Sequence, residues 1–298
     1  MQMSNRAWAE LILLSLLWGA SFLAIAIALR DIGVVSAVAH RVSWAAAILW
    51  AVVLIRRIPV PRDPKTWIAL LVMGLLNNVV PFGLITWGQV YIESGLAGIL
   101  NASTAIFGAL AASLLLPDER LTPLRALGVG VGFAGVLLTI GPAALSGLDP
   151  RALGQIAVLG AAVSYALAAV WAKRRLFGLA PEMAAAGMLT GSSMIAVPAA
   201  LMVDGVPRLD LAVSTWMAIA YYAVFATAGA YLLYYRVLAL AGSANLMLVT
   251  LIIPPIAILL GWLVLDETLP PTAGIGLATI ALGLLILDGR VLQRFGLK

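Results

Sequence analysis

The stretch Asp118–Leu138, DERLTPLRALGVGVGFAGVLL, recurs at a spacing of 148 residues as Asp266–Ile286, DETLPPTAGIGLATIALGLLI. Both copies hold an Asp-Glu pair, a Leu and a Pro, then two Gly and a Leu along an apolar run. The Pro stands where a helix would begin, because the first helical turn needs no N–H from that residue. This self-similarity indicates two homologous halves, each containing an acidic turn that leads into a Gly-rich helix.

The composition around this repeat is that of a membrane protein. Of the 298 residues, 63% are hydrophobic and 10% charged, and the mean hydropathy is +1.08. Soluble domains average roughly 25% charged residues, because their surface must be solvated. We therefore exclude a water-soluble fold and expect an all-α integral membrane protein that resides in the lipid bilayer.

Apolar runs of about 20 residues, the length that crosses a bilayer, occur ten times along the chain. The expected membrane spans are 10–29, 34–55, 66–89, 94–116, 123–141, 152–172, 181–203, 213–236, 244–265 and 271–288. The repeat divides them into two five-span domains, residues 1–145 and 146–298. Because five is odd, the second half runs inverted relative to the first, and inverted repeats are a device for alternating access.

The basic residues predict the orientation. If the N-terminus lies inside, all of the 18 Lys and Arg except Arg30, Arg41, Arg151 and Arg208 fall on the inner side. Inner loops carry the excess of positive charge, so we expect both termini in the cytoplasm of a cell-membrane protein. The basic residues lie in short loops rather than along one folded face, which argues against nucleic acid as a partner.

Three short motifs resemble a known family. They are Leu17–Phe22 (LWGASF) in the first span and the two turns Pro117–Leu121 (PDERL) and Leu265–Leu269 (LDETL). The chain resembles the drug/metabolite transporter superfamily of the EamA type, and within it the YddG-type exporters of aromatic and other neutral amino acids. The resemblance implies ten spans in a five-plus-five inverted repeat and export of amino acids or other metabolites.

No catalytic, metal or cofactor chemistry is expected. The chain has no Cys, and all its carboxylates fall at predicted span ends or in loops, so an intramembrane enzyme lacks clustered reactive groups. Gly130–Gly135 fits G-x-G-x-x-G, but it lies inside a span rather than after a strand, which favours helix packing. The absence of a buried acid also disfavours coupling to proton or sodium gradients, with His40 as the one near-neutral titrating group in the bilayer.

Mid-span polar, aromatic and proline residues are the candidates for a central substrate site. Asn is costly in hydrocarbon, and Pro frees a backbone carbonyl. Local hydrogen bonds are the alternative for each Ser or Thr, snorkelling to the surface for Arg41, and simple kinking for each Pro. The candidate substrate-binding residues are Trp18, Ser21, His40, Arg41, Trp44, Asn77, Asn78, Pro81, Asn101, Thr104, Ser164, Tyr222, Asn245 and Pro254.

Amide and aromatic groups of this kind suit a small solute with a polar end and an apolar side chain. We therefore expect an exporter of amino acids, including aromatic and neutral ones, without an obligatory protein partner. A multidrug exporter and a nucleoside or metabolite exporter fit the same residues. An intramembrane enzyme and a lipid-handling or scaffold protein are the competing classes, and the inverted repeat favours transport.

Overall fold

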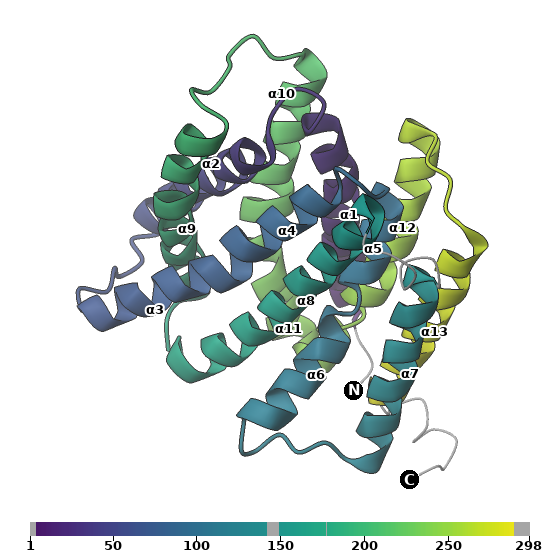
Figure 1. Ribbon diagram of the computed structural model, residues 1–298. Coiled ribbons are helices and arrows are strands. Elements are labelled where there is room, and N and C mark those ends of the chain that lie inside the picture. Colours follow the sequence, from purple (N-terminus) through teal and green to yellow (C-terminus); the bar gives the residue numbers. More distant parts are fainter. Residues whose placement is uncertain (1–3, 142–148, 177, 289–298) are drawn as a thin grey trace.

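The structure is a computed structural model that describes residues 4–141, 149–176 and 178–288 (Figure 1). It contains only helices within these residues. The first half comprises α1 (Asn5–Ala28), α2 (Val34–Ile55), α3 (Pro64–Gly74), η1 (Leu75–Val79), α4 (Val80–Gly88), α5 (Ser94–Asn101), α6 (Thr104–Leu115) and α7 (Pro123–Ile140). The second comprises α8 (Pro150–Arg175), α9 (Pro181–Val203), α10 (Val213–Ala220), η3 (Tyr221–Gly229), α11 (Ala230–Leu246), α12 (Val249–Leu265) and α13 (Pro271–Asp288).

These helices form ten membrane spans. Nine continuous helical stretches in the described part of the chain are long and apolar enough to cross a bilayer, and α12, with 17 residues, is the tenth. Two spans contain a π-helical segment, in the orders α3–η1–α4 and α10–η3–α11, and α5 and α6 form one span interrupted by a turn. The expected all-α membrane fold is confirmed, and the chain is a multi-pass membrane protein.

Three boundaries differ most from the sequence prediction, and one is the start of the first span, which was expected at residue 10 whereas α1 begins at Asn5. The eighth span was expected to end at residue 236, but helix α11 continues to Leu246 with a kink at Gly242, where φ is +77°. The ninth span was expected from residue 244, whereas α12 begins at Val249. Arg236 is tolerated inside α11 because it pairs with Glu10 on α1. The expected domain boundary, 145/146, lies outside the described residues.

Local signals explain where several helices start. Asp63, Thr122 and Asp149 each accept a hydrogen bond from the backbone N–H three residues on, and a Pro follows each within the first turn. An oxygen-bearing N-cap satisfies an N–H that the helix leaves free, and the fixed φ of Pro suits the first turn. These three membrane spans thus begin at residues that the sequence marks with an N-cap side chain and a following proline.

Helices α7 and α13 are repeat counterparts, and they pack on each other along their Gly-rich faces at one side of the bundle (Figure 1). A Cβ on Gly128 would lie 2.9 Å from the Gly283 carbonyl oxygen, and a Cβ on Gly135 would lie 2.9 Å from the Gly276 carbonyl oxygen. The glycine with the smaller residue number in α7 meets the glycine with the larger residue number in α13, and the reverse holds for the second pair, so the two helices run antiparallel. Exchanging the halves converts one contact into the other, which is the geometry of an inverted repeat.

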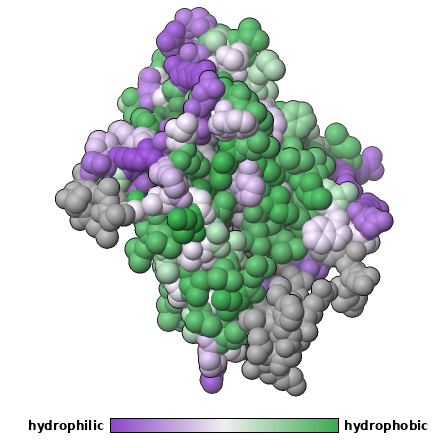
Figure 2. Space-filling view, turned by 90° about the vertical axis from the view of Figure 1, so that its right-hand side faces the viewer, coloured by the Kyte–Doolittle hydropathy of each residue, from purple (hydrophilic) through white to green (hydrophobic). Residues whose placement is uncertain are grey.

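The outer surface is suited to lipid. Large apolar side chains such as Ile55, Leu114 and Met202 are 81, 74 and 86% exposed. Figure 2 shows one side of the molecule, where hydrophobic residues cover the broad middle and hydrophilic residues gather toward the edges. Contiguous exposed apolar surface of this extent marks a membrane-embedded protein.

The end of the bundle from which α1 starts is termed the proximal side, and the opposite end the distal side.

Candidate functional site

The two π-helical segments lie at equivalent places in the two halves. Adding 148 to the bounds of η1 gives residues 223–227, which fall inside η3. In the first half the cause is Pro81, which has no N–H to continue the α-helical pattern, and the Val80 N–H bonds five residues back to Leu75. Ser164 on α8 satisfies a carbonyl that this change frees, donating to Leu76 at 2.7 Å. Single π turns within α-helices are frequent at functional sites.

Side-chain amides in η1 connect the two halves. Asn78 is fully buried; its Nδ2 donates to Ser192 Oγ on α9 at 3.0 Å, and its Oδ1 accepts from the Tyr231 hydroxyl on α11 at 2.6 Å. Asn77 Nδ2 in turn donates to the Tyr231 hydroxyl at 3.1 Å. The two adjacent asparagines of the first half therefore bind one phenol and one hydroxyl of the second half.

Arg41 on α2 reaches the same region from another side. Its Nε donates to the Thr227 hydroxyl in η3 at 2.9 Å, and its guanidinium carbon lies 3.8 Å from the centre of the Phe82 ring on α4. Thr227 donates its own proton to the Tyr222 carbonyl five residues earlier, which completes the π turn at 2.7 Å. The side chain is buried rather than extended to the surface, so snorkelling does not describe it.

Among the described residues, the sealed polar atoms without a partner are Glu10 Oε2, Ser43 Oγ, Gln89 Oε1, Asn101 Oδ1, Gln155 Oε1 and the Tyr222 hydroxyl, and two of these atoms belong to candidate site residues. These two are the Tyr222 hydroxyl and Asn101 Oδ1. Burying a polar atom without a hydrogen bond costs folding free energy, so each such atom needs an explanation, and one explanation is that the atom binds a ligand. Arg41, the Asn77–Asn78–Ser192–Tyr231 network, Thr227 and Tyr222 together are termed the polar cluster.

Three predicted site residues each donate a hydrogen bond to a nearby backbone carbonyl of the same membrane span. Ser21 donates to the Trp18 carbonyl at 2.7 Å, Thr104 to the Asn101 carbonyl at 2.7 Å, and Asn245 Nδ2 to the Ala241 carbonyl at 2.7 Å. The Trp18 ring lies 5.9 Å from that of Tyr234 on α11. The structure thus brings Arg41, Asn77, Asn78, Tyr222 and, through Leu76, Ser164 together, whereas the hydroxyls of Ser21 and Thr104 bond within their own spans.

His40 and Trp44 form a pair on α2, where Trp44 Nε1 donates to His40 Nδ1 at 3.3 Å. Trp44 is 52% exposed, so its ring lies on the lipid-facing side of the helix. His40 is half-buried and its ring centre lies 6.0 Å from that of Trp216. This pair lies on a different face of α2 from the buried Arg41.

Helices α1, α5 and α12 meet where Pro254 lies. A Cβ on Gly98 would lie 2.8 Å from Ala257 Cβ and 3.8 Å from Pro254 Cα, so the backbones of α5 and α12 approach closely. Asn101 ends α5 one turn further on. Small residues at such contacts allow transmembrane helices to approach.

Sequence reasoning gave no specific role to some residues that the structure singles out. Thr227 bonds Arg41, Ser192 bonds Asn78, and Tyr231 bonds both Asn77 and Asn78. In addition, Gln89 Nε2 donates to the Phe22 carbonyl at 2.8 Å. Mapping Pro81 across the repeat gives Gly229, the last residue of η3, and this would have directed attention to Thr227.

Unlike Arg41, the charged groups that form ion pairs between helices lie toward the ends of the bundle. Glu10 pairs with Arg6 and Arg236 at 3.0 and 2.5 Å, and Arg56 with Glu182 at 2.8 Å, all on the proximal side. Arg151 forms a bidentate pair with Glu93 on the distal side. Within the described ranges no group of His, Asp and Glu is arranged to hold a metal ion.

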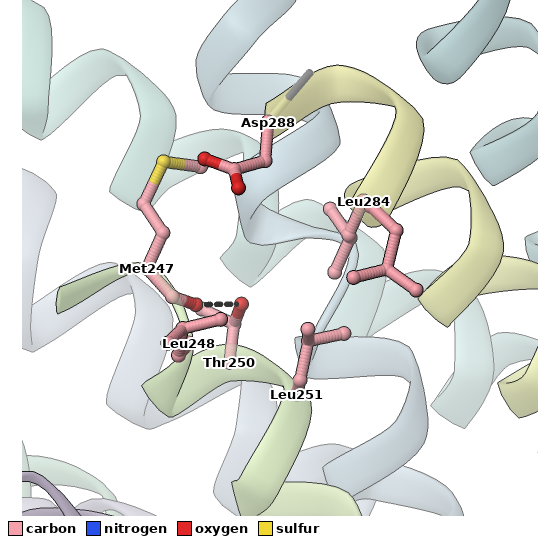
Figure 3. A pocket seen from close by; sticks show the side chains of 7 residues that line it. Met247, Leu248, Thr250, Leu251, Leu284 and Asp288 are labelled. Atoms are coloured by element: carbon pink, nitrogen blue, oxygen red, sulfur yellow. Dashed lines mark hydrogen bonds between the residues drawn. The ribbon is translucent and has the colours of Figure 1, made fainter. Parts of the chain in front are cut away.

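Two surface pockets lie away from the polar cluster. One, between the ends of α12 and α13, is lined by Met247, Leu248, Thr250, Leu251, Leu284, Leu285 and Asp288. Figure 3 shows the Thr250 hydroxyl turned onto the Met247 carbonyl, with leucine side chains and the Asp288 carboxylate around the opening. The other is an apolar groove between α6 and α8. Neither offers a convergent set of polar groups, which a metabolite site requires.

Comparison with known proteins gives one family and several relatives. The EamA-like transporter family matches the chain twice, at residues 7–141 and 152–287. "Uncharacterized transporter YoaV" of Bacillus subtilis is 23% identical over 276 residues, which cover 92% of this chain and 94% of that protein. "Probable terminal-alkyne amino-acid exporter" of Streptantibioticus cattleyicolor is 28% identical over 300 residues, covering 99% and 97%. A crystal structure with a TM-score of 0.69 and 19% identity covers 97% of this chain and 99% of that one.

Proposed function

We propose that this chain, which belongs to the EamA-like transporter family and is a membrane transporter, exports small organic metabolites, principally amino acids, by alternating access. The solute binds in the polar cluster between the two halves. The same proposal places the protein in the cell membrane with both termini in the cytoplasm, in accordance with the distribution of Lys and Arg.

The observation that carries this proposal is the set of hydrogen bonds that cross between the halves. Asn78 to Ser192, Tyr231 to Asn78 and Arg41 to Thr227 each join a residue of the first half to one of the second. Alternating access moves one half relative to the other around a site at their interface. Groups that bond across this interface in one arrangement become free for a solute when the halves move apart.

The chemistry of these groups supports amino acids as substrates. Amides and hydroxyls donate and accept hydrogen bonds, as the polar end of an amino acid requires. Phe82 and the three phenols of Tyr165, Tyr222 and Tyr231 lie near Arg41 and offer apolar faces for a side chain. A relative that spans nearly the whole chain is named a probable terminal-alkyne amino-acid exporter, which supports amino acids as the substrate class.

The proposal is tested with purified protein in liposomes. Vesicles loaded with an unlabelled solute are diluted into a trace of the same labelled solute, and accumulation by exchange is followed for amino acids, nucleosides and cationic drugs. We expect accumulation of amino acids by the wild type, a loss of at least about tenfold for Asn77→Leu, and wild-type rates for Thr279→Val. Thr279 is the control because its hydroxyl bonds to its own helix on the exposed face of α13. Exchange of nucleosides or drugs without amino acids would overturn the assignment.

A further inference from the structure

Arg41 is a buried cation for which the protein supplies no counter-ion. All thirteen Asp and Glu residues belong to the described part of the chain, and none of the ion pairs found there includes Arg41. The residue lies seven positions into α2, about 10 Å along the helix at 1.5 Å per residue, and is 7% exposed. Arginine stays protonated in proteins, so this charge cannot be relieved by losing a proton.

The contacts of Arg41 hold the guanidinium without using its terminal nitrogens. The one hydrogen bond of the side chain in the described structure is from Nε to Thr227, and Phe82 lies against the guanidinium face. Neither Nη1 nor Nη2 has a hydrogen-bond partner in the described structure, and neither is among its fully sealed polar atoms. The two terminal nitrogens of Arg41, which can bind a carboxylate in bidentate fashion, are therefore held in place without a hydrogen-bond partner in the described structure.

A second donor lies in the same surroundings. Tyr222 is 1% exposed, its hydroxyl has no partner among the described residues, and its backbone carbonyl accepts from Thr227, the residue that Arg41 binds. A neutral phenol donates a hydrogen bond but cannot neutralise a cation. A guanidinium fork and an unused hydroxyl, with no acid beside them, match a group that brings two acceptor oxygens and a negative charge.

We propose that Arg41 and Tyr222 form the carboxylate anchor of the transport site, so that the protein carries solutes with a carboxylate and rejects amines, amides and organic cations. This rests on the proposed transport function and narrows it. The substrate carboxylate binds the two terminal nitrogens of Arg41 and accepts a hydrogen bond from the Tyr222 hydroxyl. An intramembrane cation normally faces a partner or a cavity, and here the partner is the solute.

The first test varies the solute and leaves the protein unchanged. Competition for exchange in liposomes is measured with an amino acid, its N-acetyl derivative, its carboxamide and its decarboxylated amine. We expect the two carboxylates to compete and the amide and amine to be weaker by about ten- to hundredfold, the effect of losing a charge-assisted bidentate contact. Equal competition by amide and amine overturns the anchor while leaving amino-acid transport standing. Exchange of carboxylates that lack an amino group, without amino acids, overturns the amino-acid proposal and leaves the anchor.

The second test measures binding to the purified protein by thermal stabilisation, which needs no transport. Carboxylates should stabilise the wild type and Arg30→Gln, a control that removes an exposed charge, and should act on Arg41→Gln and Tyr222→Phe at about tenfold higher concentration or more. Arg41→Lys should recover part of the effect, because Lys keeps the charge without the fork. A wild type that no carboxylate stabilises, or an Arg41→Gln protein that responds like the wild type, contradicts the anchor.

Discussion

Glu267 binds the start of helix α5 at Ser94 and so connects the two halves at the distal side. Its Oε1 accepts from the Ser94 N–H at 2.9 Å, and its Oε2 accepts from the Ser94 hydroxyl at 2.8 Å and from the Gly95 N–H at 3.2 Å. A carboxylate suits this place because the free N–H groups and the helix dipole both favour negative charge. Its repeat counterpart, Glu119, instead pairs with Lys173 on the proximal side.

The two glutamates should differ in their contribution to stability. Glu267→Gln removes a charge from three hydrogen bonds at a helix start and should lower the free energy of unfolding by about 1 kcal/mol. Glu119→Gln should cost less, because both partners of that pair are about half exposed and such pairs contribute about 0 to 1 kcal/mol. Thermal unfolding in detergent measures both. Equal loss in the two variants would show that the Ser94 contact has no special role.

The α7–α13 interface depends on the absence of side chains. Gly135→Leu places a Cβ 2.5 Å from the Ile280 backbone nitrogen and should destabilise the protein by about 1 to 3 kcal/mol or prevent its folding. Gly130→Leu on the same helix is the matched control, because a Cβ there meets nothing within 4 Å. The recovery of monodisperse protein by size exclusion, followed by thermal unfolding, distinguishes them. Similar behaviour of the two variants contradicts the interface.

Asn101 lies outside the polar cluster, and Asn101→Leu tests it as a further group that bonds the solute: the variant should abolish transport and leave stability nearly intact. The Asn101 Oδ1 is sealed without a partner in the described structure, so replacing the amide by an apolar group of similar size removes an unmet hydrogen bond. Exchange in liposomes and thermal unfolding are measured on the same preparation. Normal transport, or failure only through misfolding, would make Asn101 a packing residue.

Transport should proceed down the solute's own gradient without a proton or sodium gradient. Glu10 is the one buried carboxylate residue in the described structure, and it already pairs with Arg6 and Arg236 near the proximal side. A coupled carrier commonly keeps an acid deep in the bilayer. Flux is measured with each ion gradient imposed and then collapsed. A strict requirement for either gradient refutes the expectation, and His40→Gln then tests His40 as the proton carrier.

The orientation can be read with a single cysteine, since the chain contains none of its own. Arg62→Cys lies in the loop between α2 and α3, which we expect in the cytoplasm. A membrane-impermeant thiol reagent should label it in inside-out vesicles and spare it in intact cells. Labelling only in intact cells reverses the topology.

The spans and their inverted relation could be predicted from the sequence because both depend on strong signals. Runs of about 20 apolar residues and a repeated turn at a fixed spacing need no knowledge of tertiary contacts. Pro81 likewise indicated a break in its span. The π segment at Tyr221–Gly229 was not anticipated, because no proline marks it; within it the Thr227 hydroxyl bonds the Tyr222 carbonyl, a contact that residue type alone does not specify.

The site was only partly accessible for a related reason. Asn77 and Asn78 could be selected because an amide is costly in hydrocarbon wherever it points. Trp44 could not be placed, because lipid and protein interior are similarly apolar and the sequence does not say which face of α2 is buried. The hydroxyl of Ser21 bonds to its own helix, and that choice depends on a side-chain rotamer rather than on residue type.

The most direct test of the central claim is the position of a bound amino acid in an experimentally determined structure of the complex. We expect the amino acid between η1 and η3, with its carboxylate within hydrogen-bond distance of the Arg41 terminal nitrogens and with groups from both halves around it. An amino acid bound instead in the pocket between α12 and α13, or in the groove between α6 and α8, would exclude the polar cluster as the transport site.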